Sequence, residues 1–392
     1  MVKGRSIIDR NIHLLLLVIP LYFTQGGLFP RGSIVSISCV LIWLLIDLYY
    51  LCKTIISRKL LLFEKSILIL GLYSIFSYIL SPKYVDTGWE VFSTYGELKN
   101  ILIMIFTYFP FRYVCDNSLI SDKYTVRYVL YIFVVYVFAY FVQKYEALTT
   151  MFWKDDVTNN GGYLLPLCFP LLGLFLGKKK AFLFLGLNVI LVLLSAKRGA
   201  ILCLFFELAL FFWFLLFDSS KSNKIRLNQI LLVLIGVLSL SILTFKVYMT
   251  NDYLIERFLD TKSGDSSGRD SIYEDAFKTY QNGDFIEKIF GHGFFQNLQI
   301  NNAYAHSDWY ELLVDYGIVG IVFYSLIFIG LYFWYKKNRI KMMPCYKFMF
   351  TSASGCWLIK SIFSMGINSP EAATLSIAIA MSISSVHMNK NI

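Results

Sequence analysis

The chain has 392 residues, of which 57% are hydrophobic and only 16% are charged, whereas soluble domains carry roughly 25% charged residues. A soluble fold would lack the polar surface to cover so much Leu, Ile and Phe, so this composition excludes an ordinary soluble enzyme and predicts an integral membrane protein. The net charge of +10 would suit nucleic acid, but no RNA- or DNA-binding motif accompanies it. We therefore expect no nucleic-acid partner and attribute the charge to cytoplasmic loops, where Lys and Arg accumulate.

Apolar segments long enough to cross a bilayer recur along the chain. A spanning helix needs about 20 such residues, and the pattern predicts an all-α integral membrane protein with about 12 transmembrane helices. The first apolar segment follows a short basic N-terminus without a small-residue cleavage site, so we interpret it as a retained helix. The predicted spans are residues 12–29, 32–52, 60–80, 98–115, 125–143, 162–177, 181–196, 199–217, 228–248, 316–335, 345–365 and 370–387.

The distribution of basic residues predicts the orientation. With the N-terminus in the cytoplasm, 22 of the 36 basic residues lie inside, mostly in short loops, where this bias is meaningful. The even number of spans then puts both termini in the cytoplasm. All seven Cys lie within spans or near cytoplasmic ends, so we predict neither a disulfide framework nor a Cys-based zinc site.

One connection is much longer than the others. About 65 residues, from Thr250 to Asp315, separate the ninth and tenth spans, and long loops in compact proteins are usually functional. We predict one membrane domain made of residues 1–248 and 316–392, with residues 249–315 as a large extracytoplasmic loop containing short helices. A helix-start pattern and the apolar spacing after it predict an amphipathic helix at about 268–281.

Two groups of cations lie on the predicted outer face. Lys197 and Arg198 occupy the short turn between the seventh and eighth spans, where a cation at membrane depth costs about 2.5–3.5 kcal/mol. Snorkelling would explain this pair, but so would a phosphate or carboxylate ligand, because the planar guanidinium suits phosphate. Arg269 starts the predicted outer helix, where free N–H groups attract anions, although a solvated surface Arg would look the same.

His306 lies where the long loop leads into the tenth span. Asp308 and Glu311 fit the first turn of that helix, and Gly317 and Gly320 allow a neighbouring helix to approach closely. The helix dipole disfavours imidazolium, so we expect a neutral His306 that is able to act as a general base. Loop hydrogen bonds would instead give it a structural role.

His292 lies between two glycines in the same loop, which indicates a turn. A metal site formed with His306 lacks the usual close ligand spacing. We therefore expect no metal.

Three segments, in this order, resemble the O-antigen ligase and O-antigen/capsule polymerase superfamily of bacterial envelope assembly. The strongest matches the family pattern His-[Asn/Ser]-x9-Gly-x-x-Gly. The motifs cover only about residues 195–200 and 265–320, and the first six spans carry nothing that matches. The segments are Ser195-Ala-Lys-Arg198-Gly-Ala, Gly291-His-Gly-Phe294, and His306-Ser followed after nine residues by Gly317-Ile-Val-Gly320.

The resemblance implies a GT-C-like, inverting, metal-independent glycosyltransferase of the bacterial cytoplasmic (inner) membrane that needs no cofactor. Its donor would be an undecaprenyl-diphosphate-linked oligosaccharide; a glycan acceptor, membrane lipids and a chain-length regulator would be its other partners. Carried over by position, Arg198 and Arg269 would bind the donor diphosphate as charge develops, and His306 would take the proton of the acceptor hydroxyl. Assisting residues in substrate binding would be Lys197, Asp308, His292 and Tyr273.

Polymerisation of O-antigen or of capsular or exopolysaccharide repeat units is the leading hypothesis, because the loop is modest in size and aromatic and acidic in character. A ligase that transfers the glycan onto lipid A core would use the same chemistry with another acceptor. A flippase of lipid-linked sugars would also fit twelve spans, but the two halves show no internal repeat. A structural partner in a membrane complex would leave Lys197 and Arg198 unexplained.

Overall fold

The computed structural model describes residues 9–87, 91–120, 122–150, 160–176, 178–195, 197–217, 236, 239, 242, 246 and 269–388. The helices, 3-10 helices (η) and strands in this part of the chain are α1 Arg10–Phe23, α2 Ile34–Ser57, α3 Leu62–Leu80, β1 Tyr84–Asp86, β2 Val91–Ser93, α4 Thr94–Phe106, α5 Tyr108–Asp116, α6 Asp122–Thr150, η1 Asn160–Tyr163, α7 Leu164–Cys168, η2 Phe169–Phe175, α8 Lys179–Leu194, α9 Arg198–Phe217, α12 Arg269–Asn282, α13 Phe285–Phe290, α14 Gln296–Asn301, α15 Asp308–Asn338, η3 Arg339–Lys341, α16 Pro344–Phe363, η4 Pro370–Ala372 and α17 Ala373–Met388.

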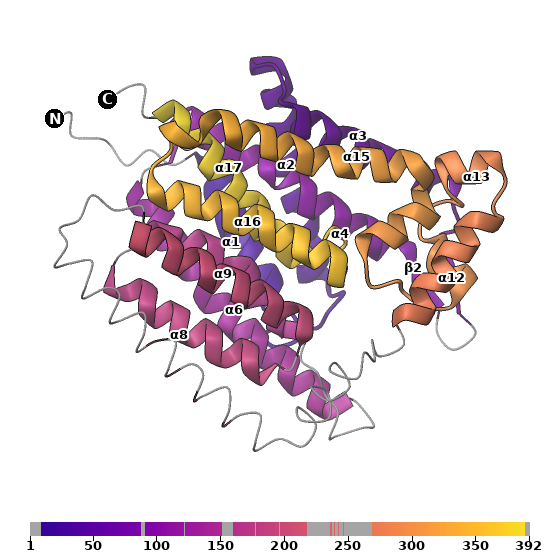
Figure 1. The fold of residues 1–392 in the computed structure, drawn as a ribbon, viewed down its shortest axis with the longest axis horizontal. Coiled ribbons are helices and arrows are strands. Elements are labelled where there is room, and N and C mark those ends of the chain that lie inside the picture. The colour runs from indigo at the N-terminus through magenta and orange to yellow at the C-terminus, as the bar shows by residue number, and fades with distance from the viewer. Residues whose placement is uncertain are drawn as a thin grey trace.

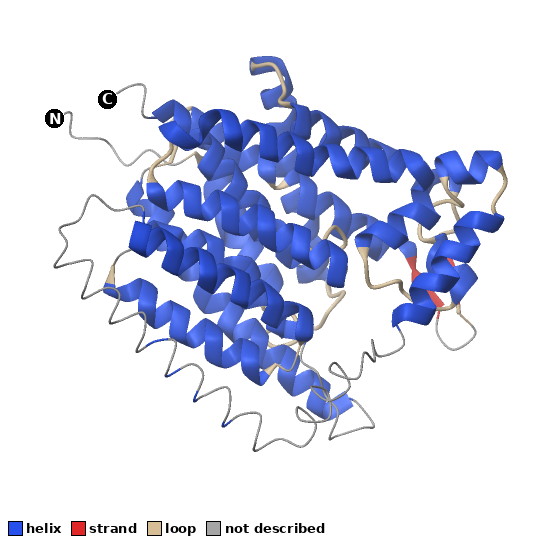
Figure 2. Cartoon of the chain, viewed as in Figure 1, coloured by secondary structure: helices blue, strands red, loops and turns tan. Residues whose placement is uncertain are grey.

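The long helices run side by side, and the two ends of this bundle differ (Figure 1). The connection between α15 and α16 lies at one end, whereas α12, α13 and β2 lie at the opposite end, which we call the loop end. Strands β1 and β2 form a short antiparallel hairpin, with Val85 paired to Phe92. Figure 2 shows that the rest of the described secondary structure is helical, so the fold is all-α apart from this hairpin.

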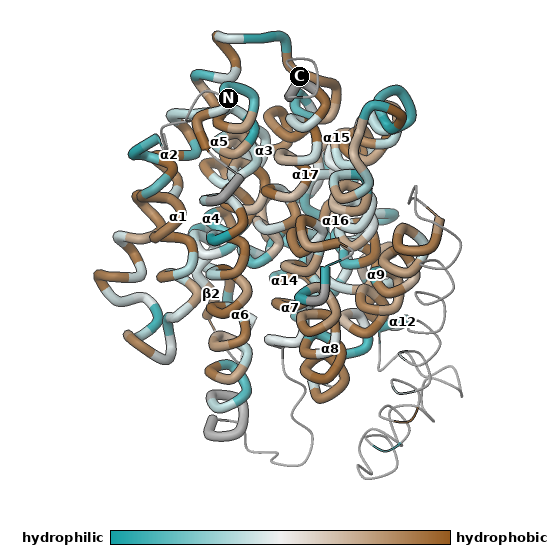
Figure 3. The backbone as a smooth tube through the Cα atoms, turned by 90° about the vertical axis from the view of Figure 1, so that its left-hand side faces the viewer, coloured by the Kyte–Doolittle hydropathy of each residue, from teal (hydrophilic) through white to brown (hydrophobic). Residues whose placement is uncertain are grey.

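Several helices have the length and composition of membrane spans. Within the described residues, five are long and apolar enough to cross a bilayer, and four shorter apolar helical stretches accompany them. Figure 3 shows hydrophobic residues along most of α6, α8 and α9. The chain is therefore an all-α, multi-pass membrane protein. The count of about twelve spans stays a prediction, because residues 228–248 lie largely outside the described residues. The first part of the predicted loop, residues 249–268, also lies outside them, whereas residues 269–315 are described.

The predicted span at residues 162–177 is not one regular helix. The structure has three short pieces there, η1, α7 and η2. Pro166 and Pro170 lie within this stretch, and each lacks the N–H that an α-helix needs for its bond to the preceding turn. The apolar composition was interpreted as a simple span, although these prolines divide it.

The predicted span at residues 98–115 is similarly divided, into α4 and α5 at Thr107. Pro110 has no N–H with which to bond the last residues of α4. The Thr107 hydroxyl receives a hydrogen bond from Trp43 Nε1 (2.8 Å) and donates one to Asp47 Oδ2 (3.1 Å). The break is therefore fixed by buried contacts with α2.

Close helix packing brings the candidate residues to the loop end. Helix α15 packs along α3, and α16 packs against both α9 and α17. Glycines allow these approaches: a Cβ at Gly330 would lie 2.7 Å from Phe63 N, and one at Gly355 would lie 2.2 Å from the Phe206 ring. Small residues at such contacts are typical of membrane helices. As a result the first turn of α9, the last turn of α16 and the first turn of α15 meet at one end.

Candidate active site

The turn that begins α9 is packed against the segment before α7. A Cβ at Gly199 would lie 1.9 Å from Tyr163 Oη, so a larger residue here would have to displace the Tyr163 ring. Ser195 Oγ accepts the backbone N–H of Lys197 at 3.3 Å and so holds the turn. The side chains of Lys197 and Arg198 are half-buried there, and both have interaction partners. The two predicted cations therefore occupy a defined position at the loop end.

Arg269 is the first residue of α12, which confirms the amphipathic helix expected here. Its Nη1 donates to the backbone oxygen of Phe363, the last residue of α16, at 2.9 Å. One turn further, Tyr273 stacks on Tyr310 in α15, with ring centroids 4.5 Å apart and an interplanar angle of 8°. Burial raises the pKa of Tyr273 against the opposing effect of Arg269. The stack thus fixes α12, and with it the guanidinium, beside the start of α15; a direct substrate contact by Tyr273 stays a prediction.

His306 has a left-handed backbone, with φ of +52°. Such a conformation is uncommon outside glycine and is found where surrounding contacts impose it. Here the chain is held on both sides of His306. The backbone N–H of Ala305 donates to Glu311 Oε1 at 2.6 Å, and Ser307 Oγ donates to the backbone oxygen of Ser361 at 3.3 Å. The turn that carries the imidazole is therefore rigidly attached to α15 and α16.

The electrostatic surroundings of His306 favour the neutral imidazole. Part of the His306 residue is exposed to solvent, but the surrounding protein partly desolvates its imidazole. This desolvation lowers the pKa of His306 below the ordinary value of 6.5, and the charges of Arg269 and Lys197 lower it further. The neutral form was expected from the helix dipole, but burial and two neighbouring cations are the causes in the structure. These effects place the charges of Arg269 and Lys197 within electrostatic range of His306.

Two buried carboxylates of α15 hold the loop that precedes it. Glu311 accepts Asn297 Nδ2 at 2.9 Å, and Asp315 accepts the N–H groups of Phe295 and Asn297 at 3.2 and 2.8 Å. The sequence contained a signal for this role, because Asp308, Glu311 and Asp315 recur at the spacing of one helix face. Only a first-turn preference was inferred from it.

Asp308 holds the segment that follows α16. Its side chain is 1% exposed. The carboxylate accepts the N–H groups of Gly366 at 2.8 Å and Ile367 at 3.1 Å, and it also accepts the Tyr324 hydroxyl. These contacts give Asp308 a positioning role in the structure, while the substrate contact that the family resemblance implied for it stays a prediction.

Lys360 is a buried cation of the same region that the sequence reasoning missed. Its Nζ donates to the backbone oxygen of Met365 and to Ser369 Oγ, and it lies 4.6 Å from the centre of the Tyr163 ring. A lysine near the outer end of a predicted span was a visible signal, because such residues are rare and mark functional or structural polar sites. Lys360 thus links α16 to the segment before α7.

His292 lies in a different set of contacts. The Nδ1 atom of its ring is 3.3 Å from Glu287 Oε1, and its backbone N–H donates to the backbone oxygen of Val314 at 2.9 Å. These bonds attach α13 to α15 rather than to the cluster around His306. A substrate-binding role for His292 stays a prediction.

Lys197, Arg269 and His306, which influence one another electrostatically, offer two chemical functions, and a place for Arg198 beside them stays a prediction. A neutral imidazole can accept a proton, and guanidinium and ammonium groups can stabilise an anion that develops beside it. In the part of the chain that the structure describes, no three His, Cys, Asp or Glu side chains are grouped so that they could hold a metal ion. The arrangement is suited to acid–base chemistry next to a phosphate.

Comparison with known proteins identifies one family. Residues 181–325 match the family described as O-Antigen ligase. The matched segment contains the turn before α9, helix α12 and the His306–Gly320 motif, and it confirms the resemblance drawn from the motifs. No curated protein matches the chain.

Proposed function

From the O-antigen ligase match across residues 181–325, we propose that this protein is an extracytoplasmic polymerase of polysaccharide repeat units. It transfers a saccharide from an undecaprenyl-diphosphate-linked donor to a hydroxyl of the next lipid-linked unit. The observation that carries this proposal is a His306 imidazole whose pKa is lowered by burial and by the charges of Arg269 and Lys197. A general base next to a phosphate-binding group is what such a transfer requires.

The proposed location is the bacterial cytoplasmic membrane, with the loop end facing outward. Basic residues support this orientation: Lys336 and Lys337 close α15 at the end opposite to His306, as the bias of Lys and Arg towards cytoplasmic loops predicts. Lipid-linked saccharides presented on the outer leaflet would reach the cluster from that side. Both termini would then be cytoplasmic.

In the proposed reaction, His306 removes the proton from the acceptor hydroxyl as its oxygen attacks the anomeric carbon of the donor. The bond between that carbon and the diphosphate oxygen breaks, and its electron pair leaves with the lipid diphosphate. Attack from the face opposite the leaving group inverts the anomeric configuration. The proton on His306 is then released to solvent or to the diphosphate, which restores the base.

Arg198, Arg269 and Lys197 would bind the diphosphate and stabilise the charge that it gains on departure. Arg269 is anchored by its bond to the Phe363 oxygen, so little reorganisation is needed when the charge develops. Loss of one preorganised donor of this kind typically costs about 10²–10³ in kcat. No nucleotide-binding region is required, because the donor is already activated by its diphosphate.

A ligase that transfers the glycan to lipid A core is the second candidate, because the matched family is described by ligase activity. The two activities share every step except the identity of the acceptor. The purified full chain in lipid nanodiscs, supplied with lipid-diphosphate-linked repeat units, should produce longer lipid-linked chains. Transfer only onto added lipid A core would establish the ligase.

The same preparation in sealed vesicles tests the transport alternative. Movement of lipid-linked saccharide across the bilayer, without formation of a new glycosidic bond, would establish a flippase and refute the proposed transfer. His13→Gln is a matched control for variants of His306, because His13 is exposed on α1. This control should leave transfer unchanged.

A further inference from the structure

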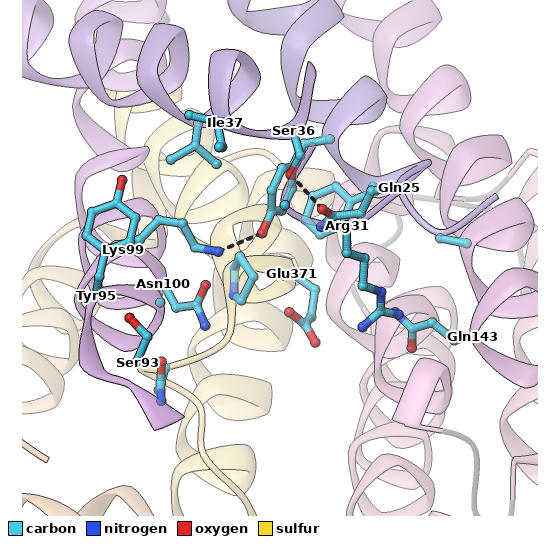
Figure 4. A pocket seen from close by; sticks show the side chains of 18 residues that line it. Gln25, Arg31, Ser36, Ile37, Ser93, Tyr95, Lys99, Asn100, Gln143 and Glu371 are labelled. Carbon is cyan, nitrogen blue, oxygen red and sulfur yellow. Dashed lines mark hydrogen bonds between the residues drawn. The ribbon is translucent and has the colours of Figure 1, made fainter. Parts of the chain in front are cut away.

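A polar cavity lies at the loop end, apart from the cluster around His306. It has a volume of about 630 Å³, within the range of roughly 300–1,000 Å³ that small-molecule sites usually span. Its walls come from the ends of α1 and α6, the starts of α2 and α4, and the segment 368–371. Figure 4 shows Lys99 and Asn100 on one side, Arg31 and Gln143 on the other, and Glu371 between them.

The polar lining of this cavity is rich in amides and hydroxyls. Four amide side chains contribute to it, namely Gln25, Asn100, Gln143 and Asn368. The Oδ1 atoms of Asn100 and Asn368 are buried and have no hydrogen-bond partner among the residues that the structure describes. A buried acceptor without a partner costs about 1–3 kcal/mol. Each of these amides lines the cavity, so a ligand that donates hydroxyl hydrogens would remove this cost once the amide turns its oxygen towards the cavity.

The charges of the cavity disfavour a diphosphate as its occupant. Arg31 and Lys99 are accompanied by the carboxylate of Glu371, which would repel a phosphate. Lys99 Nζ already donates to the Tyr22 hydroxyl at 3.1 Å, and the Gln25 oxygen accepts the Ser36 hydroxyl at 2.7 Å. Amides, a tyrosine ring and mixed charges suit a polyhydroxylated molecule, neutral or with a single negative charge.

One segment of the chain connects the cavity to the cluster around His306. Residues 366 and 367 are held by Asp308, and Lys360 Nζ donates to Ser369. The next residues, Pro370 and Glu371, line the cavity. Phe363, just before this segment, accepts the hydrogen bond of Arg269. Residues 363–371 therefore connect a molecule that fills the cavity to Arg269.

We propose that this cavity is a saccharide-binding subsite, which holds sugar residues of a substrate while its reacting end lies at the cluster. This inference rests on the proposed function for the source of the saccharide, but the binding itself can be measured alone. The sugars come either from the glycan of the acceptor or from that of the donor. The two sources differ in which substrate loses affinity when the cavity is blocked.

Gly96 offers a way to block the cavity without disturbing its walls. It lines the cavity in the first turn of α4, and a Cβ placed there would meet no atom within 4 Å. Gly96→Trp should therefore fold and fill part of the space. Gly186→Trp is the matched control, because Gly186 on α8 is equally open and does not line the cavity. Asn100→Leu removes one unpartnered acceptor at nearly constant size.

The probe is a one-repeat oligosaccharide released by mild acid from the surface polysaccharide of the host strain, and the measurement is calorimetric titration of the full chain in nanodiscs. We expect binding by the wild type and by Gly186→Trp, with affinity at least about tenfold weaker for Gly96→Trp and for Asn100→Leu. His306→Ala should bind as the wild type does. Equal affinity of Gly96→Trp and the wild type, or a phospholipid retained in the cavity instead, would overturn the subsite.

Steady-state transfer separates the two sources. A raised KM for the acceptor alone in Gly96→Trp assigns the cavity to the acceptor glycan, and a raised KM for the donor alone assigns it to the donor. Unchanged KM values for both substrates would contradict the subsite even if the free oligosaccharide binds. A wild type that binds the oligosaccharide but transfers nothing would refute the proposed function and leave the saccharide site standing.

Discussion

Replacement of Gly317 by alanine is the perturbation whose cost the structure defines best. Gly317 has φ of +61° and ψ of −155° within α15, a conformation that is essentially restricted to glycine and costs other residues about 1–3 kcal/mol. Its added Cβ would lie 2.6 Å from the carbonyl carbon and oxygen of Ile289 and 2.7 Å from Gly291 N. These are backbone atoms and cannot rotate away.

The overpacking adds about 1–3 kcal/mol, so the total destabilisation should be about 2–6 kcal/mol. The structure could relieve part of it by moving α13 away from α15, but this would break the bonds of His292 N–H to the Val314 oxygen and of Gly293 N–H to the Asp315 oxygen. Because Asp315 also holds the loop that precedes His306, relief would loosen the candidate site. Gly317→Ala should therefore lose both stability and transfer.

The assay is thermal unfolding of the full chain in nanodiscs, followed by transfer measured at a temperature well below the midpoint. The matched control is Gly186→Ala, because a Cβ at Gly186 has no atom within 4 Å. We expect an apparent midpoint lower by about 5 °C or more for Gly317→Ala, and no decrease for the control. Equal midpoints and equal transfer for the two variants would refute the argument from backbone contact.

Substitutions at three further positions probe the surroundings of His306. Because Lys197 lowers the pKa of His306, the acid limb of kcat/KM should fall below pH 6.5 in the wild type, and Lys197→Gln should move it upward; an unmoved limb would exclude this coupling. Asp308→Asn should reduce transfer by about tenfold or more and lower the melting midpoint, since it weakens bonds to buried backbone N–H groups; unaltered activity and stability would contradict the positioning role. Tyr273→Ala should lose the stack on Tyr310, worth about 0.5–1.5 kcal/mol, and Tyr273→Phe should restore transfer; a Phe variant as impaired as Ala would point to the hydroxyl instead.

Features that depend on neighbouring residues in the sequence were predicted well. Most predicted spans correspond to helices, because an apolar run of sufficient length is a local property. Helix α12 and the first turn of α15, with Asp308 and Glu311, follow from capping preferences. The divided stretches at Thr107 and at residues 160–175 were missed, because hydropathy outweighed the effect of the prolines.

Features that depend on contacts across the bundle could not be predicted. The hydrogen bond of Arg269 to the Phe363 oxygen joins residues 94 positions apart, and the cavity brings Arg31 together with Glu371. Only packing of the helices creates these neighbours. The direction of the shift in the pKa of His306 was anticipated, but its causes, burial and two cations, are tertiary and required the structure.

Chain elongation by His306→Ala tests the central claim most directly. The purified variant and the wild type, at equal amounts in nanodiscs, are supplied with lipid-diphosphate-linked repeat units, and the product lengths are resolved by gel electrophoresis. We predict that the wild type and His13→Gln form longer chains, whereas His306→Ala forms none while its melting midpoint stays within about 2 °C of the wild type. Normal chain lengths from a folded His306→Ala protein would contradict the assignment of His306 as the general base.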